Sequence, residues 1–259
     1  MTEKSETTQR SLFWEIHSGL PREGPGDKAS TQRAFHMATE LPTHPAILDI
    51  GCGPGKQTMD LAEISSGQIT AVDTHAPFLA ELTRRAAAAD QSTHIHPMLA
   101  SMFDLPFAAE SFDLIWCEGA MYFLGFEAAL KQWKRLLKPG GYLAATEPCW
   151  LKNELPEAVK TFWAEYPAMA DIPSCLKRIQ AHGYREVGYF VLPDSAWWED
   201  YYTPKLARIQ QLRQKYADQP GCLAQLDEAE QETALHKAYG DHYGYVFFVM
   251  QKMPENEPQ

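Results

Sequence analysis

Short apolar runs alternate with amphipathic runs along most of the chain. The apolar runs have the length of strands, and the runs between them have the pattern of helices with one apolar face. We expect strands at residues 46–50, 68–73, 94–98, 112–117, 142–147, 184–192 and 245–251. We expect helices at residues 30–40, 56–65, 76–89, 126–137, 157–166 and 172–182. This alternation predicts an α/β fold with a mostly parallel sheet that carries helices on both faces.

A glycine-rich loop follows the first expected strand. The sequence ILDIGCGPGKQT places Gly51, Gly53 and Gly55 between an apolar run and an amphipathic run, which is typical of a strand, a tight turn and a helix start. Glycine has no Cβ and accepts a positive φ, so a ligand can approach the backbone closely, and the helix that follows offers unpaired N–H groups. The loop is therefore a candidate ligand site.

Two common nucleotide loops fit this sequence poorly. A P-loop needs a glycine five residues before Gly55 and a serine or threonine after Lys56, but these positions hold Ile50 and Gln57. A dinucleotide-binding loop needs its third glycine at the position of Lys56. ATP hydrolysis is therefore not expected, and NAD binding is disfavoured but stays open.

Two acidic residues complete the pattern around the loop. Asp49 precedes the first glycine by two residues, and Asp73 ends the next apolar run, 22 residues beyond Gly51. At this separation a carboxylate at the tip of the second strand reaches the hydroxyls of a ribose. We therefore expect a ligand that carries a ribose.

Together these residues resemble the class I S-adenosylmethionine-dependent methyltransferases. The segments LPFAAESFDLIWCEGA and LLKPGGYLAATEP are similar to the fourth-strand segment of that family and to its turn into the fifth strand, and the resemblance spans residues 47–148. It implies a Rossmann-like, seven-stranded sheet in the order 3-2-1-4-5-7-6 with strand seven antiparallel. In that topology, a segment between strands six and seven begins and ends beside the active site.

The expected domain organisation follows from this topology. We expect a single domain over residues 1–259, with an N-terminal helical segment at 11–41, a core at 46–192 and 245–252, and a helical cap at 193–244 over the substrate pocket. Many small-molecule methyltransferases fold an N-terminal segment across the donor. Arg33 could then reach the methionine carboxylate of the donor, and a solvated helix arginine is the alternative.

The resemblance also implies residues for the donor, S-adenosylmethionine, and its product, S-adenosylhomocysteine. The loop backbone with Asp49 would hold the methionine part, Asp73 would bind the ribose, and Ser101 and Met102 would flank the adenine. Many relatives carry Asp-Ala in place of Ser101-Met102, and a serine hydroxyl accepts a hydrogen bond more weakly than a carboxylate. The residues predicted to bind the cofactor are Asp49, Gly51, Gly53, Gly55, Asp73, Ser101, Met102 and Cys117.

Candidates for the acceptor side follow from position alone. Glu118 follows the fourth strand and His242 stands just before the last one, and we predict both as catalytic residues. The alternatives are a helix cap for Glu118 and an ordinary turn residue for His242. Aromatic side chains crowd the expected pocket face, where they either form core or hold a cationic acceptor. Those predicted to bind substrate are Tyr122, Trp150, Trp197, Tyr202 and Tyr243.

The composition narrows the partners. With 23 Lys and Arg against 34 Asp and Glu, the net charge of −11 repels phosphate backbones, so we expect no nucleic-acid partner. The five cysteines form no Cys-x-x-Cys pair, and neither a signal-type N-terminus nor a membrane-length apolar run is present, which predicts a cytoplasmic protein with free thiols. No metal site is expected, because no third ligand falls at a suitable spacing. Monomer and homodimer both stay open.

The sequence thus predicts a methyltransferase that acts on a small molecule by in-line displacement at an N, O, S or C nucleophile. Its pattern is related to the ubiquinone- and menaquinone-biosynthesis type. The alternatives are a non-catalytic protein that binds an adenosyl ligand and an NAD-dependent Rossmann enzyme.

Overall fold

A central sheet organises residues 12–254, the part of the chain that this computed structural model describes. Seven strands form its path in the order β3-β2-β1-β4-β5-β8-β7, and β6 pairs with β5 beside that path. The strands are β1 (Ala46–Ile50), β2 (Gln68–Asp73), β3 (Ile95–Leu99), β4 (Phe112–Cys117), β5 (Leu137–Trp150), β6 (Ala170–Asp171), β7 (Tyr184–Val191) and β8 (Tyr243–Lys252). β8 runs antiparallel to β5 and β7, and the other pairs are parallel. The predicted fold class and strand order are confirmed, with β6 as an additional short strand.

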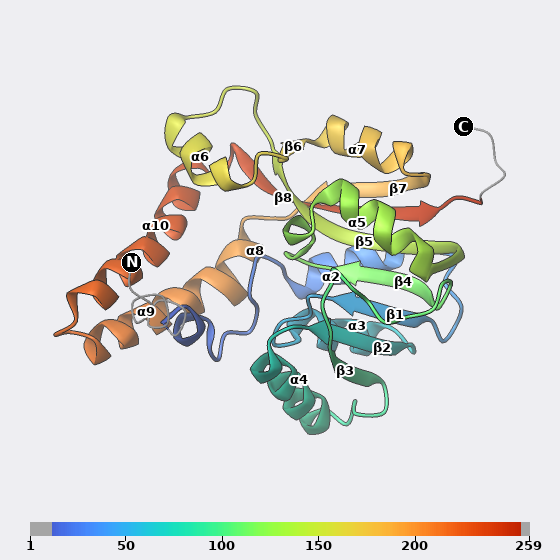
Figure 1. Cartoon of the computed structure of the whole chain (residues 1–259), viewed down its shortest axis with the longest axis horizontal. Coiled ribbons are helices and arrows are strands. Elements are labelled where there is room, and N and C mark those ends of the chain that lie inside the picture. Colours follow the sequence, from blue (N-terminus) through green and yellow to red (C-terminus); the bar gives the residue numbers. More distant parts are fainter. Residues whose placement is uncertain (1–11, 255–259) are drawn as a thin grey trace.

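Helices flank this sheet on both faces (Figure 1). The α-helices are α2 (Lys28–Met37), α3 (Lys56–Ile64), α4 (Ala76–Ala88), α5 (Phe126–Trp133), α6 (Glu157–Phe162), α7 (Ile172–Ala181), α8 (Ser195–Trp197), α9 (Thr203–Lys215) and α10 (Pro220–Tyr239). Shorter helical turns are η1 (Met121–Phe123), η2 (Lys134–Leu136), η3 (Trp163–Glu165) and the π-helical η4 (Trp198–Tyr202). Residues 12–17 are also helical, and the predicted start of the N-terminal segment at residue 11 lies outside the described residues.

Two apolar layers hold the helices against the sheet. Alternate residues of β5 point to opposite faces, so Tyr142 and Ala144 pack in the layer under α2, α3 and α4, whereas Leu143 and Ala145 pack in the layer under α5 and α7. β8 is buried along its whole length, because it lies between β5 and β7 and has a layer on each face. This explains its almost continuous apolar sequence.

The main differences from the predicted boundaries lie around β5. The predicted strand at 142–147 is longer in the structure, because β5 pairs with β8 up to Trp150 and Tyr243. The predicted helix at 126–137 ends as α5 at Trp133 and continues as the turn η2. No pattern predicted β6, since a two-residue strand is too short to show alternation.

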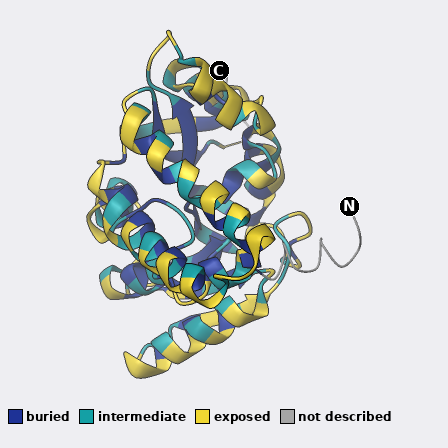
Figure 2. Cartoon of the chain, turned by 90° about the vertical axis from the view of Figure 1, so that its left-hand side faces the viewer, coloured by how far each residue is buried: buried dark blue, intermediate teal, exposed yellow. Residues whose placement is uncertain are grey.

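Helices α8, α9 and α10 follow β7 and precede β8, and we call residues 195–239 the cap. The helical residues 12–17 pack onto the cap through an apolar cluster that includes Leu12, Ile16, Ile209 and Leu226. Figure 2 views the molecule from the cap side, where the long helices carry exposed residues on their outer surfaces. Within residues 12–254, no helix combines the length and the apolar composition needed to cross a membrane.

Candidate active site

A cavity of about 1170 Å³ opens at the carboxyl ends of the parallel strands. Its wall includes residues that directly follow β1, β2, β3 and β4, together with the helical residues near position 14 and side chains of the cap. Open α/β sheets bind their ligands at this edge, where the strand order reverses between β1 and β4. The topology therefore brings the glycine loop and the cap to the same cavity.

The glycine loop forms one wall of the cavity with its backbone. Gly51, Gly53 and Gly55 have φ values of +72°, +53° and +88°, in the left-handed region that favours glycine. A Cβ on Gly51 would lie 2.6 Å from the Cβ of Ala120, so no larger residue fits without a shift of the β4 loop. Gly51 and Gly53 line the cavity, whereas Gly55 lies behind them at the start of α3 and faces Leu82.

Asp73 is the last residue of β2, and its side chain is hydrogen-bonded to the glycine loop and lines the cavity. Its Oδ2 accepts a hydrogen bond of 2.9 Å from the backbone N–H of Gly53, and its Oδ1 accepts one of 2.8 Å from that of His75. The ring of Trp14 stacks on the ring of His75 with centroids 3.7 Å apart. The carboxylate is thus held in place where two loops meet, as a group that binds ribose hydroxyls must be.

Asp49 lies beneath the loop and does not line the cavity. Its Oδ2 accepts a hydrogen bond of 2.6 Å from the hydroxyl of Thr58 in α3, and its Oδ1 has no partner within residues 12–254. Complete burial raises the pKa of Asp49 to about 7. Cys117 is likewise fully buried outside the cavity wall, so the predicted contacts of these two residues with the donor stay untested predictions.

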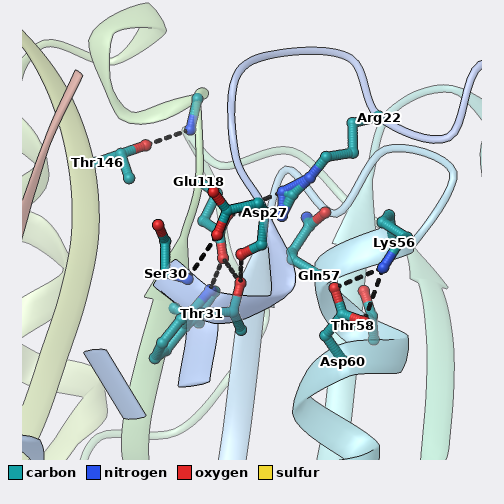
Figure 3. Close-up of polar contacts among 12 residues, drawn as sticks. Arg22, Asp27, Ser30, Thr31, Lys56, Gln57, Thr58, Asp60, Glu118 and Thr146 are labelled. Carbon is teal, nitrogen blue, oxygen red and sulfur yellow. Dashed lines mark hydrogen bonds and ion pairs between the residues drawn. The ribbon is translucent and has the colours of Figure 1, made fainter. Parts of the chain in front are cut away.

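Glu118 lines the cavity, but its oxygens are already engaged. Its Oε2 accepts from both terminal nitrogens of Arg22, at 2.9 and 2.7 Å, and its Oε1 accepts from the Thr31 hydroxyl at 2.9 Å and the Trp116 indole at 2.8 Å. Figure 3 shows the pair and the contact with Thr31 at the start of α2. The geometry supports a role in holding the N-terminal segment over the glycine loop, rather than the catalytic role that we predicted.

Arg22 extends from that N-terminal segment to the cavity wall. The side chain is 3% exposed, and its Nε has no hydrogen-bond partner among the described residues. Arg33, which we had considered for the methionine carboxylate, is instead an exposed residue of α2 with its guanidinium 4.0 Å from the ring centre of Phe190. The structure therefore places Arg22, and not Arg33, where a carboxylate in the cavity could be bound.

The loop after β3 provides a separate part of the wall. Ser101 and Met102 line the cavity, as do Thr74 and Phe78, and the contact of Ser101 and Met102 with an adenine stays a prediction. The Ser101 hydroxyl accepts a weak hydrogen bond of 3.3 Å from the backbone N–H of Phe103. It stays free to exchange hydrogen bonds with a ligand, because a hydroxyl has one donor and two acceptor sites.

The cap supplies the opposite wall, which is aromatic with one internal ion pair. Lys205 in α9 is 3% exposed, and its Nζ lies 2.5 Å from Oε2 of Glu232 in α10. The Tyr202 hydroxyl donates to Oε1 of the same carboxylate at 3.0 Å. The aromatic residues of the cap and of β8 that line the cavity are Trp197, Tyr201, Tyr202, Tyr243 and Tyr245.

Two predicted residues lie away from this wall. His242 precedes β8, its Nδ1 lies 2.6 Å from Oδ1 of Asp241, and its backbone carbonyl accepts a hydrogen bond from Leu151. Trp150 ends β5 opposite Tyr243. Neither lines the cavity, whereas Tyr122, Trp197, Tyr202 and Tyr243 do. The roles predicted for His242 and Trp150 are therefore without geometric support.

The fold and this site define a Rossmann-like methyltransferase architecture, and comparison with known proteins agrees. Residues 47–141 match the methyltransferase domain family. The chain is 26% identical to the O-methyltransferase resE of Aspergillus sclerotiorum over 71% of this chain and 76% of that protein. It is 37% identical to the malonyl-[acyl-carrier protein] O-methyltransferase of Salmonella typhimurium over 43% of this chain and 41% of that protein. The latter match thus spans less than half of the relative's length.

A solved structure extends the likeness to almost the whole chain. The S-adenosylmethionine-dependent methyltransferase of Geobacter sulfurreducens, determined with S-adenosylhomocysteine, superposes with a TM-score of 0.79 at 18% identity and covers 95% of this chain and 98% of its own. At that identity the likeness shows the fold. The domain match, the relatives and the fold together support the prediction of a class I S-adenosylmethionine-dependent methyltransferase. The ubiquinone-type relationship stays a prediction.

Proposed function

We propose that this protein transfers the methyl group of S-adenosylmethionine to an oxygen of a small, uncharged and largely apolar acceptor that binds beneath the cap. The observation that carries the proposal is a single cavity with a glycine-loop wall and an aromatic cap wall. A cavity of about 1170 Å³ is large for one small ligand, so it has room for a donor and an acceptor together.

The donor end has the groups that S-adenosylmethionine requires. The glycine wall, which bears no side chains at Gly51 and Gly53, allows close approach of a ligand, and Asp73 presents a fixed carboxylate to a ribose. The unpartnered, buried Nε of Arg22 fits a carboxylate such as that of methionine. Ser101 and Met102 stand at the end where the adenine would lie. The loop offers no pyrophosphate cradle, which disfavours the alternative of an NAD-dependent enzyme.

The charge of the wall restricts the acceptor. Six carboxylates line the cavity, and the two Lys and Arg side chains, Arg22 and Lys205, each pair with one of them. An anionic acceptor would be repelled, and this argues against a carboxylate acceptor such as that of malonyl-[acyl-carrier protein], the substrate named for one relative. An uncharged hydroxyl compound avoids the repulsion and matches the aromatic wall, and both relatives named above are O-methyltransferases.

The residues act mainly by positioning and by excluding water. A sulfonium methyl is transferred by in-line displacement, so the protein must hold the donor and the acceptor atom in line. The glycine loop and Asp73 fix the donor end, while the aromatic cap wall places the acceptor and shields the sulfonium from water. The cap is connected to the helical residues 12–17 through their shared apolar cluster, so both close the cavity from the same side.

A screen with isotopically labelled donor tests the proposal. The protein, the labelled S-adenosylmethionine and a panel of phenols, alcohols, amines and carboxylic acids are incubated, and labelled products are detected by mass spectrometry. Transfer to uncharged hydroxyl compounds is expected. Transfer only to carboxylic acids would contradict the acceptor class, and binding of S-adenosylhomocysteine without transfer to any compound would favour a non-catalytic binding protein.

Cytoplasmic localisation and the absence of nucleic-acid and membrane partners stay predictions. The oligomeric state stays open.

A further inference from the structure

A second buried carboxyl group lies near the cavity and has no role in donor binding. Glu147 is in β5 and is 1% exposed, and its Oε2 has no partner within residues 12–254. Its Oε1 accepts a hydrogen bond from the hydroxyl of Tyr166, which follows the turn η3. A buried carboxyl group without a cationic partner costs folding free energy, so its presence calls for an explanation.

Tyr166 connects this carboxyl group to the cavity. Its side chain lines the cavity wall, whereas Glu147 lies behind it. The ring of Tyr122, which also lines the cavity and follows β4, makes an edge contact with that of Tyr166 at a centroid distance of 5.8 Å. The loop after β4 that carries Tyr122 also carries Ala120, which lies against the glycine wall, so this loop connects Tyr166 with the donor end of the cavity.

The surroundings of Glu147 favour its protonated form near neutral pH. Burial raises its pKa to about 8, although the hydrogen bond from Tyr166 opposes the rise. Arg178 of α7 is the cation that acts on it, but this side chain donates to the carbonyl of Ala168 and lies 3.9 Å from Glu127. The other titratable groups that interact electrostatically with Glu147 are Cys117, Cys149, Tyr122, Tyr166 and Tyr245.

From this geometry we propose that Tyr166 and Glu147 form a proton relay that deprotonates the hydroxyl of the acceptor. This rests on the proposed function. As the acceptor oxygen forms its bond to the methyl carbon, the bond from that carbon to the donor sulfur breaks, and its electron pair stays on sulfur as the thioether of S-adenosylhomocysteine. The acceptor proton moves to the Tyr166 oxygen while the proton of Tyr166 moves to the Glu147 carboxylate. Charge balances, because one sulfonium and one carboxylate are consumed and a neutral thioether and a neutral carboxyl group are formed.

The burial of Glu147 also has a consequence for folding, which shows whether this carboxyl group is buried at the expense of stability. Because the pKa of Glu147 is raised on folding, the folded state binds more protons than the unfolded state between the ordinary glutamate pKa and about 8. The free energy of unfolding therefore falls as the pH rises through that window. Glu147→Gln removes this pH-dependent loss of stability. The variant should therefore have a higher free energy of unfolding than the wild type at pH 9, and the difference should be smaller at pH 5.

The test compares Glu147→Gln, Tyr166→Phe and Glu147→Asp with the wild type. Tyr184→Phe is the matched control, because it also removes a buried tyrosine hydroxyl, one that donates to the carbonyl of Leu130 and does not line the cavity. Calorimetry with S-adenosylhomocysteine, thermal unfolding at pH 5 and pH 9, and methyl transfer from pH 6 to 10 to the acceptor found in the screen are measured for each protein.

We expect S-adenosylhomocysteine to bind all variants within about twofold of the wild type. Transfer by the wild type should rise with pH to a plateau above the pKa of Glu147, and kcat should fall by about 100-fold or more in Glu147→Gln and Tyr166→Phe, on the scale of general base catalysis. Glu147→Asp should recover part of the rate, and Tyr184→Phe should keep it.

Three results would overturn the relay. The first is normal transfer by Glu147→Gln or Tyr166→Phe, and the second is a wild-type rate that does not change between pH 6 and 10. The third is a Glu147→Gln variant that is less stable than the wild type at pH 9, which would show a structural contact. Binding of S-adenosylhomocysteine with no transfer by the wild type would overturn the proposed function and the relay with it, and is distinguished from the other results by the wild-type assay.

Discussion

The two ends of the cavity are built in different ways. The donor end is mainly a backbone surface within one strand-loop-helix-strand unit. The N–H of Gly51 donates to the carbonyl of Val72, and that of Gly53 donates to the carboxylate of Asp73. The acceptor end is a side-chain surface assembled from four separate parts of the chain, namely residues 12–17, the segment around Tyr166, the cap and the start of β8. A backbone surface tolerates few changes, whereas a side-chain surface can be altered one residue at a time. The donor end should therefore be the rigid part of the site and the acceptor end the part that selects the substrate.

The largest loss of donor affinity is expected for a substitution in the glycine wall. Gly51→Ala places a Cβ at a positive φ, which costs about 1–2 kcal/mol, and within 2.6 Å of Ala120, where overpacking costs about 1–3 kcal/mol more. Affinity for S-adenosylhomocysteine should fall by more than about 100-fold, measured by calorimetry. Gly125→Ala is the control, because Gly125 also has a positive φ but has open space around its Cβ position. Equal losses in both variants would show that strain alone, and not the wall, is responsible.

A smaller effect is expected at the ribose end. Asp73→Ala removes a charged acceptor, and the loss should weaken binding of S-adenosylhomocysteine by about 1–3 kcal/mol. Asp73→Asn keeps one acceptor oxygen for the N–H of Gly53 or His75, so it should lose less. Calorimetry at constant pH measures both. Unchanged affinity in a folded Asp73→Ala protein would show that this carboxylate does not bind the ribose.

The contrast between the two ends also explains what could be predicted from the sequence. The bounds of β1, β2 and β4 were predicted correctly, because each strand is a short apolar run between clear turn residues. The glycine loop and Asp73 were found from local spacing for the same reason. Arg22 and the pair of Lys205 with Glu232 were missed, since the paired residues are 27 positions apart in two different helices and no spacing rule links them. Tyr166 and Glu147, 19 residues apart, are brought together by the way the chain returns from α6 to β6.

Substitutions in the cap should weaken binding of the acceptor and leave binding of the donor unchanged, the opposite of substitutions at the donor end. Lys205→Met removes the charge that balances Glu232 inside the aromatic wall but leaves the glycine loop untouched. We expect KM for the acceptor to rise by about tenfold while affinity for S-adenosylhomocysteine stays within about twofold, because the partly buried Glu232 carboxylate loses its cationic partner, at a cost of about 1–3 kcal/mol. The matched control is Arg213→Met, which breaks an ion pair between the same two helices away from the cavity. If Lys205→Met weakens binding of the donor as much as binding of the acceptor, the two ends of the cavity do not act independently.

The smallest effect on activity is expected for His242→Ala. This variant tests whether the place of His242 in the sequence or its place in the structure indicates its role. The sequence places this residue just before the last strand, where we predicted a catalytic base, but in the structure its ring lies off the cavity wall beside Asp241. Its backbone, which any residue can provide, bonds to Leu151 and Tyr239. We therefore expect His242→Ala to keep kcat and KM within about twofold and to lower stability by about 0.5–3 kcal/mol, the usual range for a substitution of a partly buried residue. Steady-state kinetics and thermal unfolding measure both quantities. A large loss of kcat with unchanged binding of S-adenosylhomocysteine would restore His242 as the base and count against the relay through Tyr166.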